Sequence, residues 1–275
     1  MGKKRLDILL VERNLADTRE KAKRLIMAGL VFSEQVRLDK PGVKVDETIP
    51  LLVKGKAIPY VGRGGLKLEK ALKTFHIDTQ DRILVDVGSS TGGFTDCALQ
   101  NGAKLSYAID VGYNQLDWKL RNDERVIVME RTNFRYVTPD MLQHGLPNLA
   151  TIDVSFISLK LILPVLKHIL LQNSDVVALI KPQFEAGREQ VGKKGIVRDK
   201  KVHFNVLQRL TDFAISEGYE LFDITFSPVT GGDGNIEFLV HLGWNYVGKE
   251  GKLLSDVELE QVVEEAHAEL KTGNK

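Results

Sequence analysis

Seven strand-length apolar runs between residues 83 and 242 constrain the fold of this 275-residue chain most strongly. They are ILVDVG, LSYAIDVG, VIVME, LATIDVSF, VVALIKPQF, ELFDITFSP and IEFLVHL, and helix-like segments separate most of them. Strands that alternate with helices are typical of a parallel sheet covered on both faces. The last two runs are joined by the loop VTGGDG, so the final strand is expected to return antiparallel. The sequence therefore predicts a Rossmann-like, doubly wound sheet of six parallel strands and one antiparallel strand.

A small basic unit precedes this sheet. Residues 1–60 carry 13 Lys or Arg against 8 Asp or Glu, a net charge of +5, whereas residues 61–275 carry 25 against 29, a net charge of −4. A basic domain favours a polyanionic partner because Lys and Arg displace counterions from phosphates, although a solvated basic face is the alternative. We expect a small α+β domain at residues 1–60, the α/β domain at 61–245 and an acidic C-terminal helix or tail at 246–275.

The expected terminal helix is SDVELEQVVEEAHAEL. Ser255 and Glu258 have the spacing of a capping box, which predicts the helix start. Its apolar side is expected to contain Leu254, Val257, Val262, Ala266 and Leu270. The pattern leaves open whether this side packs on the chain's own body or on a partner.

Cysteine and histidine usage limits the possible chemistry. The single cysteine, Cys97, excludes a disulfide framework and a multi-thiolate metal site, and it fits the reducing cytoplasm. The six histidines show no metal-ligand spacing, so we expect no metal. No signal-peptide pattern follows MGKKRLD, and charges interrupt every long apolar stretch before the roughly 18 residues that a membrane helix needs. These features predict a cytoplasmic protein with no membrane span.

The turn DVGSSTGGFTD follows the first strand. Gly88 and Gly92 let the backbone pass close to a ligand beyond Asp86, and the spacing differs from the dinucleotide pattern G-x-G-x-x-G. Asp110 ends the next strand, where a carboxylate can accept hydrogen bonds from both hydroxyls of a ribose. The turn and this acid favour a cofactor that contains a nucleoside, and solvated strand-end acids are the alternative.

Four further charged residues are expected at the same edge of the sheet. Asp153 and Lys181 follow strands, and Pro182 keeps Lys181 extended. Lys67 opens a helix that runs antiparallel to the first strand, and Glu237 opens the returning strand. Since ligands of open α/β sheets bind beyond the carboxyl ends of the strands, two lysines and two carboxylates are expected to share one site.

The basic domain resembles a known RNA-binding module. Residues 5 to about 53, with RLDILLVERNLADTREKAKRLIMAGLVF followed by KPG, are similar to the module first described in ribosomal protein S-four. Asp17 and Glu20 predict a capping-box-like start for its second helix, and Gly29 predicts the end. Phe32, Ser33 and Glu34 depart from the family's usual valine and Asn-Gly turn, which leaves the turn geometry open. The resemblance implies RNA binding, and the expected contacts are Arg19, Lys23, Arg24 and Arg37.

The larger domain resembles the hemolysin-A-like branch of the FtsJ-type ribose 2′-O-methyltransferases. The motifs GRGGLKLEKAL, DVGSSTGGFTD, AIDVGYNQL, ERTNFR, TIDVSFISL, ALIKPQFEAGREQVGKKGIVRD and GGDGNIEFL match this family in order. The resemblance implies S-adenosylmethionine as cofactor and ribosomal RNA, through a cytidine, as substrate. It implies a catalytic tetrad of Lys67, Asp153, Lys181 and Glu237, with cofactor contacts at Asp86, Gly88, Gly92 and Asp110 and with Asn133 near the adenine.

Such a tetrad fits methyl transfer to a hydroxyl, which requires in-line alignment and loss of a proton. A lysine, with a usual pKa of about 10.4, is a poor base near neutrality. Lys181 is therefore either a base made competent by its surroundings or a group that orients the hydroxyl while the proton leaves late. Both cases remain open at this point.

The segment EAGREQVGKKGIVRDKK, directly after Lys181, is expected to cover the RNA substrate. Its lysines, Lys193 and Lys194 among them, can contact phosphates, although an ordinary solvated loop has the same composition. Two other functions remain possible: a non-catalytic RNA-binding regulator, and the membrane-active cytolysin that the family's name suggests. Pseudouridine synthases also carry this head but have a different catalytic body.

Overall fold

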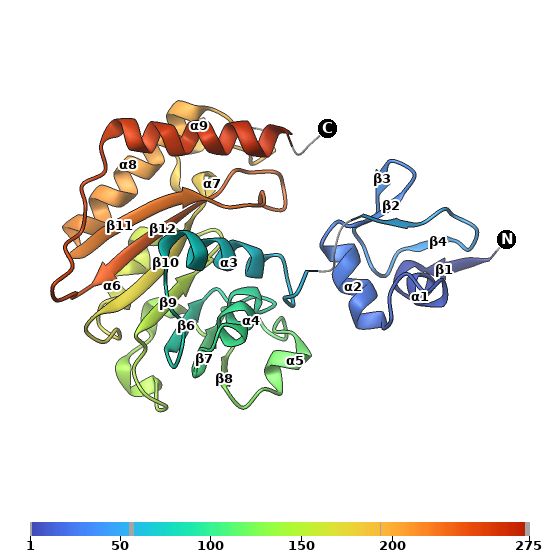
Figure 1. Cartoon of the computed structure of the whole chain (residues 1–275), viewed down its shortest axis with the longest axis horizontal. Helices are drawn as coiled ribbons and strands as arrows, with labels where there is room; N and C mark the ends of the chain where they lie inside the picture. Colours follow the sequence, from blue (N-terminus) through green and yellow to red (C-terminus); the bar gives the residue numbers. More distant parts are fainter. Residues whose placement is uncertain (1, 55–57, 193, 273–275) are drawn as a thin grey trace. The chain divides into compact units, whose positions relative to one another are not determined.

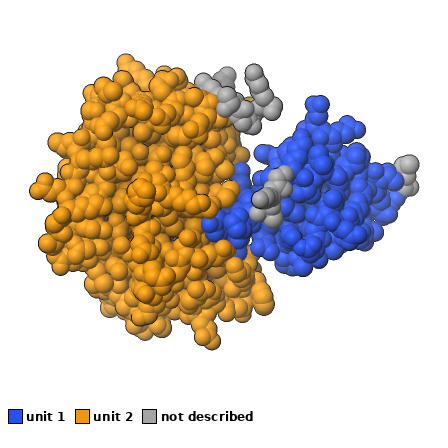
Figure 2. Space-filling view, viewed as in Figure 1, with its two compact units in different colours: residues 1–63 blue, residues 64–275 orange. Residues whose placement is uncertain are grey.

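A computed structural model describes residues 2–54, 58–192 and 194–272 of the chain. The chain divides into two compact units, Met1–Arg63 and Gly64–Lys275, coloured separately in Figure 2. The domain limits expected from the sequence, 1–60, 61–245 and 246–275, stay a prediction. Each unit has its own hydrophobic core.

Unit 1 is the predicted small α+β domain. Its core contains Leu6 and Leu10 from the first helix and Ala22, Leu25 and Ile26 from the second. The antiparallel sheets have the strand orders β1-β4 and β3-β2-β5. The elements are β1 Lys3–Arg5, α1 Leu6–Glu12, α2 Arg19–Met27, β2 Val31–Ser33, β3 Val36–Arg37, β4 Lys44–Asp46 and β5 Leu52–Val53.

Helix α2 begins one residue later than predicted. Thr18, not Asp17, is the N-cap, and its side chain accepts a hydrogen bond from Lys21 N at 3.1 Å. Asp17 instead pairs with the Lys21 ammonium one turn ahead. Both residue types cap helices, so sequence alone does not rank them. The predicted end is confirmed, because Gly29 has φ +71° just beyond Met27.

The β2-β3 hairpin forms despite its unusual turn sequence. Phe32 pairs with Arg37 and Ser33 with Val36, which leaves Glu34 and Gln35 as a two-residue connection. Glu34 takes the left-handed φ of +53° that the family's asparagine or glycine adopts more easily. The departure in sequence therefore changes the residue at the turn but not the hairpin.

Unit 2 is built on a seven-stranded sheet with the order β11-β12-β10-β9-β6-β7-β8 (Figure 1). β12 pairs antiparallel with both β10 and β11, and the other pairings are parallel. This confirms the predicted six parallel strands and one antiparallel strand. The strands are β6 Ile83–Val87, β7 Leu105–Ile109, β8 Val126–Met129, β9 Leu149–Ile152, β10 Ser174–Ile180, β11 Tyr219–Phe226 and β12 Phe238–Trp244.

Helices cover this sheet and carry the rest of its core. α3 packs on α4, and α8 packs on α9, which lies alongside it in Figure 1. The helices are α3 Gly64–Phe75, α4 Gly93–Gln100, α5 Trp118–Arg121, α6 Leu163–Leu166, α7 Pro182–Glu185, α8 Lys200–Ser216 and α9 Asp256–Thr272, with the 3₁₀ turns η1 Phe134–Tyr136, η2 Pro139–Met141, η3 Leu159–Leu161 and η4 Arg188–Gln190. Within residues 2–54, 58–192 and 194–272, no helix combines the length and apolarity of a membrane span.

Helix α9 packs on its own unit. The predicted capping box is present, since Glu258 Oε2 accepts from Ser255 N at 2.7 Å and Ser255 Oγ accepts from Glu258 N at 3.3 Å. The predicted buried side is wrong at Val257, which is exposed. The buried apolar residues are Leu259, Val263 and Ala266, and His267 is buried beside them, because α8 and β11 meet a side of the helix shifted from the one first assigned.

Candidate active site

Two lysines and two carboxylates meet at the carboxyl edge of the unit 2 sheet. Lys67 Nζ lies 2.7 Å from Glu237 Oε2 and 3.6 Å from Asp153 Oδ2. Lys181 Nζ lies 2.6 Å from Asp153 Oδ1. Asp153 thus stands between the two ammonium groups, and the four side chains form one connected ion-pair cluster.

Chain topology explains how distant residues meet here. Lys67 lies in the first turn of α3, and Glu237 directly precedes β12. Asp153 directly follows β9, and Lys181 follows β10 as the N-cap of α7, with φ −110° and ψ 100°. Pro182 occupies the first turn of α7, where its missing N–H costs nothing, and it holds Lys181 extended. A lysine can follow this buried strand because its ammonium group forms an ion pair with Asp153 at the end of the strand.

The cluster is largely shielded from water. The side chains of Lys67 and Lys181 are each 10% exposed, and that of Glu237 is 3% exposed. Burial would raise the pKa of the Asp153 carboxyl, but attraction to Lys67 and Lys181 outweighs it and lowers this pKa below its usual value. Asp153 is therefore an anion near neutrality and holds both lysines in place.

Sequence reasoning missed one residue of this cluster, Ser155. Lys181 Nζ donates a hydrogen bond to Ser155 Oγ at 3.0 Å, so the ammonium is fixed from two sides of the same turn. The following residue, Phe156, has φ +64° and is 90% exposed, and its ring lies 4.9 Å from that of Phe184. The stretch TIDVSFISL contains both residues, but a serine in a loop carries no spacing signal of its own.

A cavity of about 340 Å³ adjoins the tetrad. Asp153 and Ser155 belong to its lining, so the tetrad and the cavity are one continuous site. Three of the cofactor candidates also line it, namely Gly88, Asp110 and Asn133. The remaining lining residues are Val87, Ser90, Ile109, Val111, Gln115, Thr132, Phe134, Val154, Phe156, Ile157 and Ile162.

At Gly88 the backbone of the glycine turn lies close to the backbone of Asp153, a member of the tetrad. Its φ is +82°, and a Cβ at this position would lie 2.6 Å from the carbonyl oxygen of Asp153. A side chain here would force the two turns apart. The glycine therefore allows the cavity floor to approach the residue that bridges the two lysines.

Asp110 and Asn133 already make hydrogen bonds within the chain. Asp110 Oδ2 accepts from Ser90 N at 2.8 Å and Oδ1 accepts from Gly112 N at 2.7 Å. Asn133 Oδ1 accepts from Arg135 N at 3.1 Å and so caps η1. A carboxylate has about four acceptor sites, so Asp110 keeps capacity for ligand hydroxyls.

Asp86 and Gly92 are not among the residues that line the cavity. Asp86 is fully buried, and its carboxylate accepts from Thr95 Oγ1 at 2.7 Å and Thr151 Oγ1 at 2.9 Å. Burial raises its pKa to about 6. Gly92 has φ +92°, and a Cβ there would lie 2.2 Å from Leu120 Cδ1. The structure thus places both residues where they support the turn, and direct contact with a cofactor stays a prediction for them.

The expected RNA-contact residues lie on both units. On unit 1, Lys23 and Arg24 lie on α2 and Arg37 lies on β3. Arg19 Nε is held 2.9 Å from Asp7 Oδ2, a buried carboxylate that Arg5 also contacts. On unit 2, Lys194 is exposed, whereas Lys193 lies outside the described residues.

Comparison with known proteins agrees with this architecture. Residues 60–244 match the family model of the FtsJ-like methyltransferases, and residues 4–48 match the S4 domain. The chain is 67% identical to YqxC of Bacillus subtilis (strain 168), whose name carries a provisional rRNA-methyltransferase assignment; the match covers 98% of this chain and 96% of that protein. It is 41% identical to the 16S/23S rRNA (cytidine-2′-O)-methyltransferase TlyA of Mycobacterium tuberculosis (strain H37Rv), over 86% of this chain and 89% of TlyA.

A solved structure from Streptococcus thermophilus, provisionally named a hemolysin, is similar over nearly the whole chain. Its sequence is 52% identical, the TM-score is 0.79, and the match covers 99% of this chain and 98% of that one. The two resemblances read from the sequence are confirmed. Because the FtsJ-like family model matches about two thirds of its length, the chain belongs to the FtsJ-like methyltransferase family, and it carries an N-terminal S4 domain.

Proposed function

We propose that this protein transfers a methyl group from S-adenosylmethionine to the 2′-hydroxyl of a cytidine in ribosomal RNA. One observation carries the proposal: the Lys67–Asp153–Lys181–Glu237 cluster shares a wall with the cavity that Gly88 and Asp110 line. A donor bound in the cavity and an acceptor bound at the cluster would therefore be close enough to react.

The cavity has suitable groups for a nucleoside cofactor. Asp110 supplies a carboxylate with spare acceptor sites for ribose hydroxyls. Asn133 and Phe134 supply an amide and a ring at the end near η1, where an adenine would lie. When bound, S-adenosylmethionine supplies an electrophilic methyl group attached to a sulfonium.

The tetrad would position the hydroxyl and manage its proton. Asp153 and Ser155 fix the Lys181 ammonium, and Glu237 with Asp153 fixes that of Lys67. Lys181 then places the 2′-oxygen in line with the methyl carbon. The oxygen–carbon bond would form as the carbon–sulfur bond of the donor breaks, and the hydroxyl proton would pass to Lys181 if its amine is free, or to water after the transfer if it is charged.

Ribosomal RNA as the substrate follows from the S4 domain and from what TlyA of M. tuberculosis is named to modify. Lys23, Arg24 and Arg37 on unit 1 and the 187–201 segment of unit 2 would contact RNA phosphates. The cytoplasm is the compartment that this substrate requires.

The decisive experiment maps ribose methylation in both ribosomal RNAs by mass spectrometry, from cells with and without the protein. A cytidine that loses its 2′-O-methyl group in the deletion strain, and regains it with the wild-type chain, supports the proposal. Unchanged methylation together with undetectable S-adenosylmethionine binding in calorimetry would favour the non-catalytic regulator. Leakage from liposomes with purified protein would favour the membrane-active reading.

A further inference from the structure

The loop between β7 and α5, residues 110–117, forms one side of the cofactor cavity. Asp110 and Gln115 line the cavity, and Val111 lies beside them. The loop contains Asn114 with φ +55°, a left-handed conformation that even asparagine adopts at some cost. Its position therefore depends on contacts that hold it from outside.

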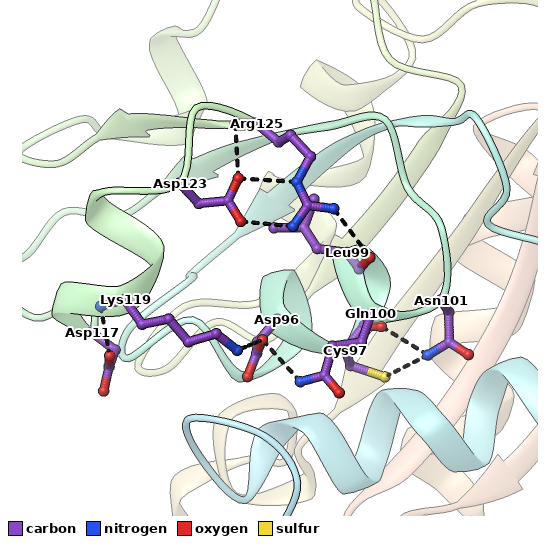
Figure 3. Close-up of polar contacts among 9 residues, drawn as sticks. All are labelled: Asp96, Cys97, Leu99, Gln100, Asn101, Asp117, Lys119, Asp123 and Arg125. Atoms are coloured by element: carbon purple, nitrogen blue, oxygen red, sulfur yellow. Dashed lines mark hydrogen bonds and ion pairs between the residues drawn. The ribbon is translucent and has the colours of Figure 1, made fainter. Parts of the chain in front are cut away.

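The glycine-turn side supplies one set of contacts. Ser90 N donates to Asp110 Oδ2 at 2.8 Å, and Asp117 N donates to the Thr91 carbonyl at 3.1 Å. Figure 3 shows that α5 is also tied to α4, because Lys119 Nζ reaches Asp96 Oδ1 at 2.9 Å. Both ends of the loop are thus fastened next to the glycine turn.

Glu130 supplies the contacts on the other side. It directly follows β8, its side chain is 9% exposed, and it lies outside the cavity lining. Glu130 Oε1 accepts from Gln115 N at 3.0 Å and from Leu116 N at 3.4 Å. The same oxygen lies 2.7 Å from Arg121 Nη2, beyond the loop. One carboxylate oxygen therefore accepts from two backbone N–H groups of the loop and from Arg121 of α5, the helix that follows it.

The charge state of Glu130 suits this role. Burial opposes its ionisation, but hydrogen bonds from the Asn114 backbone, the Arg121 side chain and the Leu116 and Gln115 backbones outweigh it and lower the pKa to about 2. An anion accepts hydrogen bonds more strongly than a neutral group. Because its partners are main-chain N–H groups, the carboxylate restrains the backbone conformation of the loop and not only the position of a side chain.

The residue after Glu130 reinforces the same loop. Arg131 N donates to the Gly112 carbonyl at 2.9 Å, and its guanidinium lies 4.1 Å from the centre of the Tyr113 ring. Arg131 has φ +54°, an uncommon conformation for arginine. The two residues that follow β8, Glu130 and Arg131, thus both contact residues 112–116.

We propose that Glu130 is a positioning residue for the cofactor: it holds residues 112–116 so that Asp110 and Gln115 face the cavity, without touching the cofactor itself. The role rests on the proposed binding of S-adenosylmethionine. A simple ion pair with Arg121 would leave the loop unaffected, whereas the two backbone hydrogen bonds tie the carboxylate directly to a cavity-lining residue.

The test measures S-adenosylmethionine binding by calorimetry on the full chain, for wild type, Glu130→Ala and Glu130→Gln. Loss of the carboxylate in Glu130→Ala is expected to raise Kd about tenfold, and Glu130→Gln, which keeps a neutral acceptor, to raise it less. The matched control is Glu124→Ala, which alters an exposed carboxylate on the turn before β8.

Kinetics separate positioning from general damage. With saturating RNA, KM for S-adenosylmethionine should rise while kcat stays within about twofold, because the bound loop regains its geometry. A merely structural role would lower the active fraction and leave Kd and KM unchanged, and that result overturns the inference. If Glu130→Ala fails to fold, folded Glu130→Gln with wild-type Kd has the same consequence. If the wild-type chain itself binds no cofactor, the proposed function fails and not the role of Glu130 alone.

Discussion

Lys67 Nζ and Glu237 Oε2 lie 2.7 Å apart although 170 residues separate them. β12 runs antiparallel to β10, so its first residues and the first turn of α3 reach the same edge of the sheet. Both side chains are largely buried from solvent, and Glu237 is the nearer of the two carboxylates around the Lys67 ammonium. Loss of Glu237 would leave Asp153 to serve both lysines.

Glu237→Gln is therefore expected to lower both stability and turnover. A buried donor that loses its charged partner costs about 1–3 kcal/mol, and the 3.6 Å contact with Asp153 should keep the loss near the lower end. Urea unfolding and methyl-transfer kinetics measure the two effects. The control is Glu69→Gln, which removes the exposed pair with Lys73 and should change unfolding by less than about 0.5 kcal/mol. Equal effects of the two substitutions would contradict a special role for Glu237.

Lys181→Ala should strongly reduce methyl transfer without weakening the binding of S-adenosylmethionine. Lys181 contacts Asp153 and Ser155 at the tetrad end of the site, away from Asp110 and Asn133. The methyl-transfer rate is expected to fall by a factor of about 10² to 10⁴, the range for a lost acid–base or orienting group, with S-adenosylmethionine affinity nearly unchanged. Lys104→Ala, at an exposed position before β7, is the control. Wild-type turnover by Lys181→Ala would remove Lys181 from the mechanism.

The direction of each strand was predictable from the sequence, and with it the edge at which Lys67, Asp153, Lys181 and Glu237 lie. The side of the sheet toward which a given side chain points was less predictable. Asp86 precedes the last residue of β6, and because side chains alternate along a strand it points away from its neighbours Val85 and Val87, toward Thr95 of α4. A one-residue difference in where a strand ends thus moves a carboxylate from the edge to the interior.

Two residues with positioning contacts left no sequence pattern. Ser155 lies in the turn DVSF and contacts the side chain of a lysine 26 positions away, whereas Glu130 begins ERTNFR and accepts hydrogen bonds from main-chain N–H groups. Their positions relative to these partners depend on the order of β8, β9 and β10 in the sheet, which is decided by tertiary packing. Helix α9 shows the same limit, since its start was readable from Ser255 and Glu258 but its buried side depended on α8.

The basic residues of α2 are expected to divide between folding and RNA binding. Hydrogen bonds from Arg5 and Arg19 lower the pKa of the buried Asp7 carboxyl to about 2. Arg19→Ala should therefore mainly lower the stability of the S4 domain, by removing one of the partners of a buried charge. Lys23→Ala and Arg24→Ala should instead weaken RNA binding and each reduce the slope of log Kd against log salt by about 1.

Thermal melting and RNA titrations at several salt concentrations distinguish these effects. A reduced salt slope for Arg19→Ala without any loss of stability would assign that arginine to phosphate contact. An unchanged slope for both Lys23→Ala and Arg24→Ala would exclude these two half-buried residues of α2 from the RNA interface.

A buried histidine pair is expected to make the anchoring of α9 dependent on pH. His203 Nδ1 on α8 lies 2.9 Å from His267 Nε2 on α9, and His203 Nε2 lies 3.2 Å from the Val197 carbonyl. Burial, followed by repulsion from His267, lowers the pKa of His203 to about 4, against smaller opposing effects of Val197 and Asp199. The unfolded chain therefore binds a proton more readily than the folded chain between about pH 4 and the usual histidine pKa of about 6.5.

Since the unfolded state takes up the proton, stability should be fully present above about pH 6.5 and decline, by on the order of 2 kcal/mol, as the pH falls toward about 4. His203→Phe should remove this part of the pH dependence, at the cost of the two hydrogen bonds near neutrality. His168→Phe, at an exposed position after α6, is the control and should follow the wild type. Urea unfolding at pH 7.5, 6 and 4.5 gives the three curves. If wild type and His203→Phe run parallel, the pair does not titrate on unfolding and adds no pH dependence to the anchoring of α9.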